Sequence, residues 1–167
     1  MEFTSNNTFH LSDLSAKISI GKTQAHLFGA EINTKHSSLN IDAEFNFRDL
    51  KNIKEQLQEV SFLINYKGNI NATDYSVFLT KSKSFRNYPN MNIGGTFEGK
   101  LKAFQMKDIS IETARGVSIR ADGELNDLIN DKIVNGKIHF KKLYISKAAV
   151  NYYLADSVLP NTIEIPD

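Results

Sequence analysis

The sequence predicts a mostly β protein: an antiparallel meander curled into a taco-like, groove-forming sheet, with two or three short helices. Apolar and polar residues alternate strictly along five or more segments, which indicates strands with one apolar and one solvated face. Short turn-like connections between these segments favour a meander over a Greek key. Three glycines fall on the apolar side, where a strand glycine permits a bend and would let the sheet curl: Gly95, Gly99 and Gly123.

Strands are expected in the following order. The first covers residues 14–20, and Gly21-Lys22 forms a turn before a second strand that carries Phe28, Ala30 and Ile32. The turn at 35–38 leads to the clearest alternation of the chain, "LNIDAEFNF" at 39–47. Further strands are expected at 62–66, closed by 67–69, and at 93–101, 109–111, 117–125, 138–140 and 143–145.

Helical signals are few. Asp49 is a candidate cap for a helix with one apolar face, formed by Leu50, Ile53, Leu57 and Val60. Ser146 is a candidate cap for a helix that turns Val150, Tyr153 and Leu154 inward. A short helical turn is expected within 73–83.

We interpret residues 1–167 as one β-rich domain taken from a larger protein, because the length suits one domain and the start resembles an excised segment. Two weak repeats are predicted, at about 9–60 and 90–130. Within them "LNIDAEFNFRDLKN" aligns with "VSIRADGELNDLIN", so Leu39 matches Val117 and Asp49 matches Asp127. Residues 155–167 form an expected extended tail with two prolines.

Composition argues against several classes of function. Twenty basic and 19 acidic residues give a formal net charge of +1, which offers nothing to attract nucleic acid. The absence of cysteine excludes disulfides, thiolate metal sites and cysteine nucleophiles. The four histidines have no metal-ligand spacing, so neither a metal nor a cofactor is expected: His10, His26, His36 and His139.

No nucleophile motif or phosphate-binding loop is present, and we predict that the chain is not an enzyme. Carboxylates do share a strand face in two places, Asp42 with Glu44 and Asp122 with Glu124, where they could serve as acid and base. Ser, Asn and Arg complete those faces, so the simpler interpretation is a solvated sheet surface.

The apolar faces leave two alternatives. They are either closed core, as in a structural or protein-binding β-sandwich, or the lining of an open trough. Seven or eight half-apolar strands outnumber the few helices that could cover them. If a trough exists, its expected lining is Leu39, Ile41, Phe45, Phe47, Phe62, Ile64, Ile93, Phe97, Val117, Ile119 and Leu125.

The order of these segments resembles the TamB family of the AsmA-like group, in its Bacteroidetes form. The resemblance is carried by residues 9–52, 67–78 and 92–128, and by the proline-flanked "LPNTIEIP" at 159–166. The patterns are of strand and glycine, with no catalytic signature. This chain departs from the pattern after Phe78, where Leu79-Thr80 replace an expected proline.

The resemblance implies a non-enzymatic module of a periplasm-spanning envelope protein whose parent is anchored in the inner membrane. It implies a hydrophobic β groove that handles phospholipid acyl chains on their way to the outer membrane. It also implies a role in outer-membrane protein assembly together with a barrel partner. In this family the C-terminal part of the protein contacts the barrel, and no segment of this chain matches that part.

Overall fold

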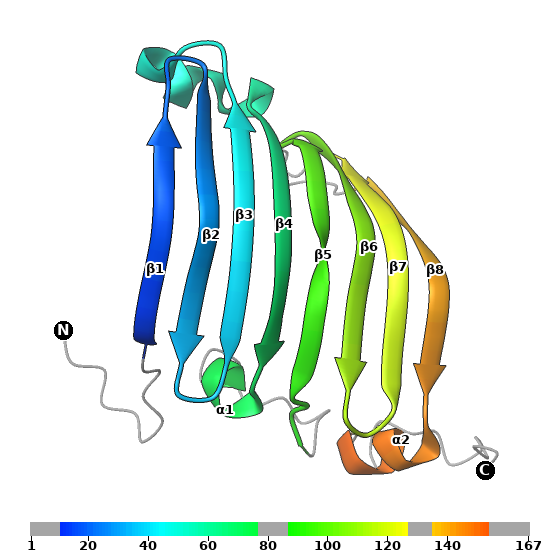
Figure 1. Cartoon of the computed structure of the whole chain (residues 1–167). Helices are drawn as coiled ribbons and strands as arrows, with labels where there is room; N and C mark the ends of the chain where they lie inside the picture. The colour runs from blue at the N-terminus through cyan, green and yellow to red at the C-terminus, as the bar shows by residue number, and fades with distance from the viewer. Residues whose placement is uncertain (1–10, 77–86, 127–134, 154–167) are drawn as a thin grey trace.

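The computed structural model describes residues 11–76, 87–126 and 135–153, which form one eight-stranded antiparallel sheet (Figure 1). Every strand is nine to eleven residues long. Their bounds are β1 Leu11–Ile20, β2 Gln24–Thr34, β3 Ser38–Asn46, β4 Ser61–Ile70, β5 Met91–Lys100, β6 Ala103–Thr113, β7 Val117–Asn126 and β8 Asn135–Ile145.

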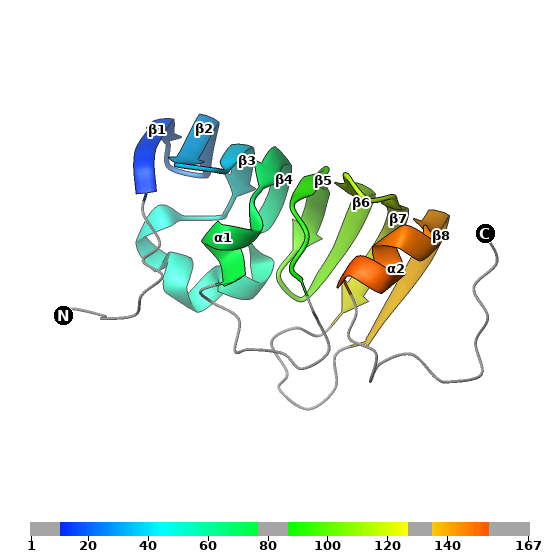
Figure 2. The same cartoon turned by 90° about the horizontal axis from the view of Figure 1, so that it is seen from below.

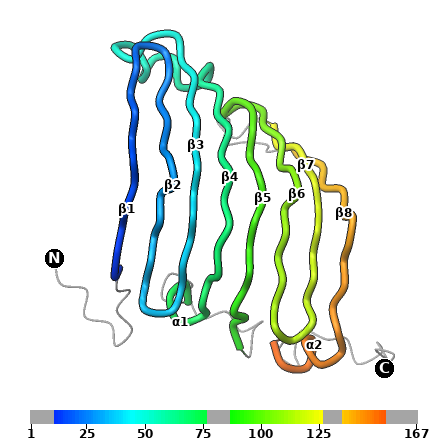
Figure 3. The backbone as a smooth tube through the Cα atoms, in the orientation of Figure 1, coloured from blue at the N-terminus to red at the C-terminus, as the bar shows by residue number. Residues whose placement is uncertain are grey.

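Each strand pairs with the strand that precedes it in the sequence, so the sheet order is β1 to β8 without a crossover. The backbone trace follows this zigzag from one edge to the other (Figure 3). The described residues add three short helices: η1 Leu50–Glu59, α1 Ala72–Tyr75 and α2 Lys147–Tyr153. The predicted mostly β meander with few short helices is therefore confirmed. The sheet is open, and its curling into a taco-like groove stays a prediction.

The expected turn at Gly21-Lys22 is confirmed, because the Gly21 N–H donates to the Gln24 carbonyl over 2.8 Å. The expected end of the fourth strand at 67–69 is wrong. β4 continues to Ile70, and Gly68 lies inside the sheet, opposite Leu39 on one side and Ile93 on the other. A Cβ at Gly68 would lie 2.4 Å from the Ser38 carbonyl oxygen, so the glycine serves close strand approach here and makes no turn.

A β-bulge changes the expected facing of β2. The register shifts between Leu27 and Ala30, and Gly29 adopts a φ of 51°. The extra residue reverses the alternation, so Leu27 and not Phe28 shares a face with Ala30. The expectation that Phe28 lies on the apolar side is therefore wrong.

The helix after Asp49 forms, but as a 3-10 helix with a kink at Asn52. The Asp49 carboxylate accepts a hydrogen bond from the Lys51 N–H over 3.2 Å, which confirms the cap. A 3-10 helix repeats every three residues, so Ile53 and Gln56 are half-buried in one row. Leu57 falls outside that row and is exposed, and Leu50 at the start of the helix is exposed too, which corrects the expected apolar face.

Helix α2 begins where predicted. The Ser146 Oγ accepts a hydrogen bond from the Ala149 N–H over 3.0 Å and donates to the Arg115 carbonyl over 2.7 Å. Ala149 and Tyr153 are buried, whereas the predicted inward residue Leu154 lies outside the described residues. The predicted tail at 155–167 also lies outside them, as do Asp127 and Leu128 of the second repeat.

Little of the described chain is buried. Eight described residues are buried: Ala30, Ala43, Phe47, Val60, Gly94, Ala121, Ala149 and Tyr153. Three of these are alanines inside the sheet and Gly94 lies in β5, whereas the other four lie at the strand ends or in α2. Figure 2 shows η1 and α1 on one side of the sheet, and Figure 1 places them near the strand ends. The described part of the molecule therefore has no central layer that covers the sheet.

Candidate functional site

Strand register gathers the apolar side chains on one face, which we call the apolar face. Directly opposed residues in neighbouring strands share a face. Phe45 faces Phe62 across β3 and β4, and Ile64 faces Phe97 across β4 and β5. The rest of the predicted lining joins this face through the pairs Leu39–Gly68, Ile41–Tyr66, Gly68–Ile93, Phe104–Leu125, Ile111–Ile119 and Val117–Ile145.

The predicted lining residues differ in burial. Phe47 is 7% exposed and follows β3, where its N–H donates to the Thr23 carbonyl. It is therefore closed core at one end of the sheet. The other predicted residues are half-buried within strands: Leu39, Ile41, Phe45, Phe62, Ile64, Ile93, Phe97, Val117, Ile119 and Leu125.

An aromatic cluster occupies the middle of the apolar face. The Tyr66 and Phe97 rings stack with centroids 5.2 Å apart. Phe104 meets Phe97 edge-on at 6.0 Å and Phe62 at 5.8 Å. Partial burial raises the pKa of the Tyr66 hydroxyl, so the phenol is neutral at ordinary pH. Four rings from three strands thus form one continuous apolar patch.

Glycines make the cluster possible. Tyr66 lies opposite Gly95, and a Cβ on Gly95 would come within 3.2 Å of the Tyr66 hydroxyl and 2.6 Å of the Ile109 side chain. Gly99 has a φ of 136°, and a Cβ there would lie 2.7 Å from the Phe104 Cα. The large side chains of neighbouring strands therefore cross over these glycines.

The apolar face is most exposed at its two outer strands. On β1, Leu14 is 60% and Ile18 is 63% exposed. On β8, Ile138 is 58% and Leu143 is 57% exposed. Contiguous exposed apolar surface of this kind marks an interaction site in soluble proteins. An open antiparallel sheet with many exposed hydrophobic residues on one face is the principal feature of the described structure.

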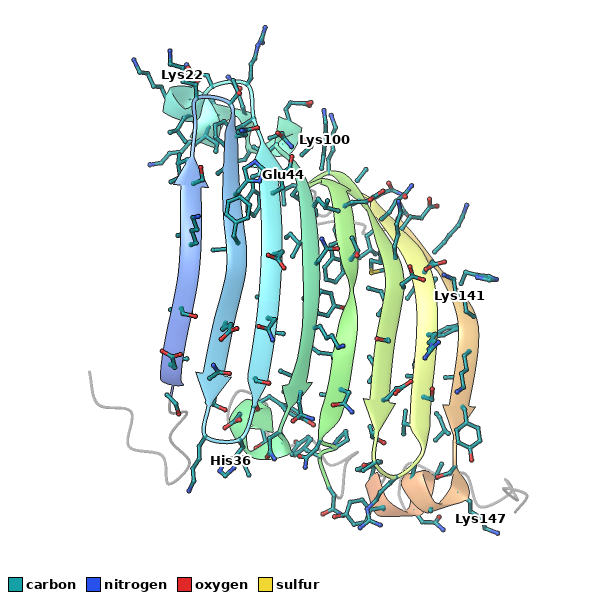
Figure 4. The ribbon with its side chains drawn as sticks, in the orientation of Figure 1. Lys22, His36, Glu44, Lys100, Lys141 and Lys147 are labelled. Carbon is teal, nitrogen blue, oxygen red and sulfur yellow. The ribbon has the colours of Figure 1, made fainter. Side chains whose placement is uncertain are left out.

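The opposite face is polar. Glu44 and Lys141 belong to it and project toward the viewer in Figure 4. Lys141 donates to Asp122 over 2.7 Å and to Asp108 over 2.9 Å. The hydrogen bond from Lys141 is the main reason that the pKa of Asp122 lies below its usual value. These charges form a solvated ion-pair network on the strand surface.

The paired carboxylates singled out by sequence bind structural partners. Asp42 accepts a hydrogen bond from the Gly29 N–H, and Asp122 accepts one from the Asp108 N–H, each over 2.8 Å. Glu44 accepts from the Asn46 amide over 2.9 Å, and Glu124 lies 3.7 Å from the Lys137 amine. Each aspartate therefore holds a bulge in the neighbouring strand.

Several residues of the apolar face lie outside the predicted lining. The alternation of the two outer strands predicts strands there but does not distinguish lining residues, and the sequence pattern predicts no strand at Phe104 and Met106. The β6 alternation shifts at the bulge between Met106 and Ile109, which hides its period. The additional residues on the apolar face are Leu14, Ile18, Ile20, Leu27, Ile32, Tyr66, Phe104, Met106, Ile109, Ile111, Ile138, Phe140, Leu143 and Ile145.

Comparison of the chain with protein-family models, with curated proteins and with solved structures finds no match. Across residues 11–76, 87–126 and 135–153, no helix is long and apolar enough to cross a bilayer. The same ranges hold no group of three or more His, Asp or Glu side chains arranged to bind a metal ion.

Proposed function

We propose that the apolar face is a lipid-contacting surface and that this chain is a non-enzymatic module for phospholipid transfer. The observation that supports it most is the open sheet, whose apolar side chains larger than alanine stay half-buried or exposed on all eight strands. If this face belonged to a closed hydrophobic core, a second layer of structure would cover it.

The physical case rests on the cost of moving an acyl chain through water. Each methylene that leaves an apolar environment costs about 0.8 kcal/mol. An apolar strip across neighbouring strands lowers that cost along the whole route without any chemical step. Adjacent strands lie about 4.8 Å apart, so eight strands offer a strip roughly 34 Å wide.

The sequence resemblance supplies the cellular setting of this proposal. We infer a TamB-like parent protein that is anchored in the inner membrane and crosses the periplasm. In that setting the module would pass phospholipid acyl chains toward the outer membrane, or assist outer-membrane protein assembly together with a barrel partner. Curling of the sheet into a trough would shield the acyl chains from water on more than one side.

The test is a titration of the purified chain with a fluorescent long-chain phospholipid analogue. We expect saturable binding to the unaltered protein. Ile41→Asp and Ile119→Asp each place a charge on the apolar face, where water reaches it, so folding should survive while lipid binding falls at least several-fold.

Asn65→Asp is the matched control. Asn65 is exposed on the polar face of β4, and its side-chain oxygen already accepts a hydrogen bond from Thr96 over 2.7 Å. The same added charge at this position should leave lipid binding unchanged. Absence of saturable binding to the unaltered chain would favour a protein-binding or structural module. Unfolding of both isoleucine variants by circular dichroism would identify the face as sealed core.

A further inference from the structure

The two outer strands of the sheet each have one unpaired edge. Within the described ranges 11–76, 87–126 and 135–153, β1 pairs only with β2, and β8 pairs only with β7. They run in opposite directions at the two sides of the sheet in Figure 1. A copy placed beside the first in the same orientation would therefore set β8 antiparallel to β1 of its neighbour. Unpaired edges of ten and eleven residues are templates for further pairing.

The sheet contains a structural repeat that shows how such a junction would be built. β2 carries a bulge at Gly29 with a φ of 51°, and β6 carries one at Asp108 with a φ of 49°. Asp42 on β3 binds the first bulge and Asp122 on β7 binds the second. Superposing the two bulges aligns β1–β4 with β5–β8, except that β8 carries one extra residue, Lys141, at its register shift. This superposition pairs Asp42 with Asp122, an offset of 80 residues, and so corrects by two residues the predicted match of Leu39 with Val117.

This alignment makes the β4–β5 junction a template for pairing between copies. Ile18 corresponds to Phe97, because they face the equivalent residues Leu27 and Met106. Ile138 likewise corresponds to Ile64. Ile64 faces Ala43, which follows Asp42, and Ile138 faces Gly123, which follows Asp122. The other equivalences on the apolar face are Leu14 with Ile93, Ala16 with Gly95, Ile20 with Gly99, Gly136 with Phe62, Phe140 with Tyr66 and Leu143 with Gly68.

The template specifies a register for β8 of one copy against β1 of another. At the β4–β5 junction, Ile64 faces Phe97, Tyr66 faces Gly95, Phe62 faces Gly99 and Gly68 faces Ile93. The transferred pairs on the apolar face are Ile138–Ile18, Phe140–Ala16, Gly136–Ile20 and Leu143–Leu14.

Side-chain sizes suit this register. Phe140 would lie over Ala16, as Tyr66 lies over Gly95 within the sheet. Gly136 would leave room for Ile20. The transferred pairs on the polar face contain no two opposed carboxylates and no two opposed lysine or arginine side chains: Lys137–Ser19, His139–Lys17, Lys142–Ser15 and Tyr144–Asp13.

Residues of the outer strands are more exposed than their equivalents in the inner strands, as expected for strands with a neighbour on one side only. Ile18 is 63% exposed, whereas its equivalent Phe97 is half-buried because it has a strand on each side. The same contrast holds between Ile138, which is 58% exposed, and the half-buried Ile64. Pairing of β8 with β1 would give both residues the environment that their equivalents already have.

We propose that a second copy of this chain docks on the sheet edge, with its β1 beside β8 in the register of the β4–β5 junction. The contact joins two different edges, so each added copy leaves one β1 and one β8 free. Self-association then extends beyond the dimer as concentration rises. This proposal is independent of lipid binding.

Disulfide trapping tests the register directly, because the natural chain contains no cysteine. Ser15→Cys protein is mixed with Lys142→Cys protein under mild oxidation. Both positions are exposed on the polar face of an outer strand, so neither change disturbs the fold. We expect the mixed disulfide dimer to form several-fold faster than with Ser19→Cys in place of Ser15→Cys. Four residues along a strand move the thiol by about 13 Å.

Sedimentation of the unaltered chain supplies the second measurement. The average mass should rise with concentration, and Ile18→Lys should remove that rise by placing a charge at the contact. Phe28→Lys is the control, because Phe28 is also exposed but lies on the polar face. A monomer at every concentration overturns the proposal. So do equal trapping rates for Ser15→Cys and Ser19→Cys, or dominant dimers between two Lys142→Cys chains.

Discussion

Asp42 on β3 accepts a 2.8 Å hydrogen bond from the backbone N–H of Gly29, the residue that makes the bulge in β2. Asp122 on β7 makes the same bond, at the same length, to the N–H of Asp108 in the bulge of β6. The extra residue of a β-bulge has no hydrogen-bond partner in the backbone of the neighbouring strand. The aspartates supply that partner, so two bulges persist at equivalent places in one sheet.

Replacement of Asp42 tests this role. Asp42→Ala removes the acceptor and should lower the free energy of unfolding by about 1 kcal/mol, since the bond is solvent-exposed. Asp42→Asn keeps an oxygen acceptor and should lose less. Urea unfolding measures both values. Equal losses for the two variants would show that the side-chain oxygen does not hold the bulge.

Gly99 is predicted to tolerate a side chain poorly. A Cβ at this position would lie 2.6 Å from the Ala103 carbonyl oxygen and 2.7 Å from the Phe104 Cα, and its φ is 136°. Backbone atoms cannot move aside as a flexible side chain does, so Gly99→Ala should cost about 2 to 3 kcal/mol. Thermal unfolding measures the loss.

Gly21→Ala is the matched control for that measurement. The nearest atom to its added Cβ is the Gln24 carbonyl oxygen at an ordinary 3.5 Å. The control should change stability by less than about 1 kcal/mol. If Gly99→Ala is as mild as the control, close approach of β5 and β6 does not require glycine.

Acid should weaken the contact between η1 and the β5–β6 turn. Glu59 accepts hydrogen bonds from Lys100 over 2.6 Å and from Lys102 over 2.7 Å. The hydrogen bonds from these lysines lower the pKa of Glu59 from 4.5 to about 2. A carboxylate with a lowered pKa in the folded state stabilises the fold above pH 4.5, and this stabilisation is lost as pH falls toward 2.

The measurement is the melting temperature as a function of pH. The unaltered chain should lose more thermal stability between pH 4.5 and 2 than Glu59→Gln does, because the variant has no carboxylate to protonate. The difference should shrink at high salt, since all three side chains are largely exposed. Parallel pH profiles would mean that the Glu59 pair contributes nothing to folding.

The sequence was sufficient to predict the strand faces wherever alternation was uninterrupted. Residues 39–47 and 117–125 show this clearly, because a period of two can place every second side chain on only one side. The caps at Asp49 and Ser146 were also predictable from residue type and position. Local preferences alone decide these features.

Bulges and close strand contacts were not predictable from local pattern. The bulge at Gly29 moves Phe28 to the polar face, and the bulge at Asp108 hides the continuity of Met106 with Ile109. Gly68 looks like a turn residue, yet it lies mid-strand because Leu39 and Ile93 approach it from both sides. These features depend on partners distant in sequence.

Openness of the apolar face was the other unpredictable feature. Strands that line a closed core and strands that line an exposed surface share one alternation. The distinction depends on whether another layer covers them, which no single strand encodes. The alanines at 30, 43 and 121 are buried within the sheet, as is Gly94, and the larger apolar residues around the alanines are half-buried.

Under the proposed function, acyl chains contact the aromatic cluster of the apolar face. The natural chain contains no tryptophan, so one introduced residue reports a single place. Phe97→Trp puts the reporter in the cluster, and Asn65→Trp puts it on the polar face of the neighbouring strand. Phospholipid with brominated acyl chains quenches only a tryptophan that it touches. We expect strong, saturable quenching of the tryptophan at position 97 and little quenching at position 65. Equal quenching at both positions, or none at 97, would contradict it.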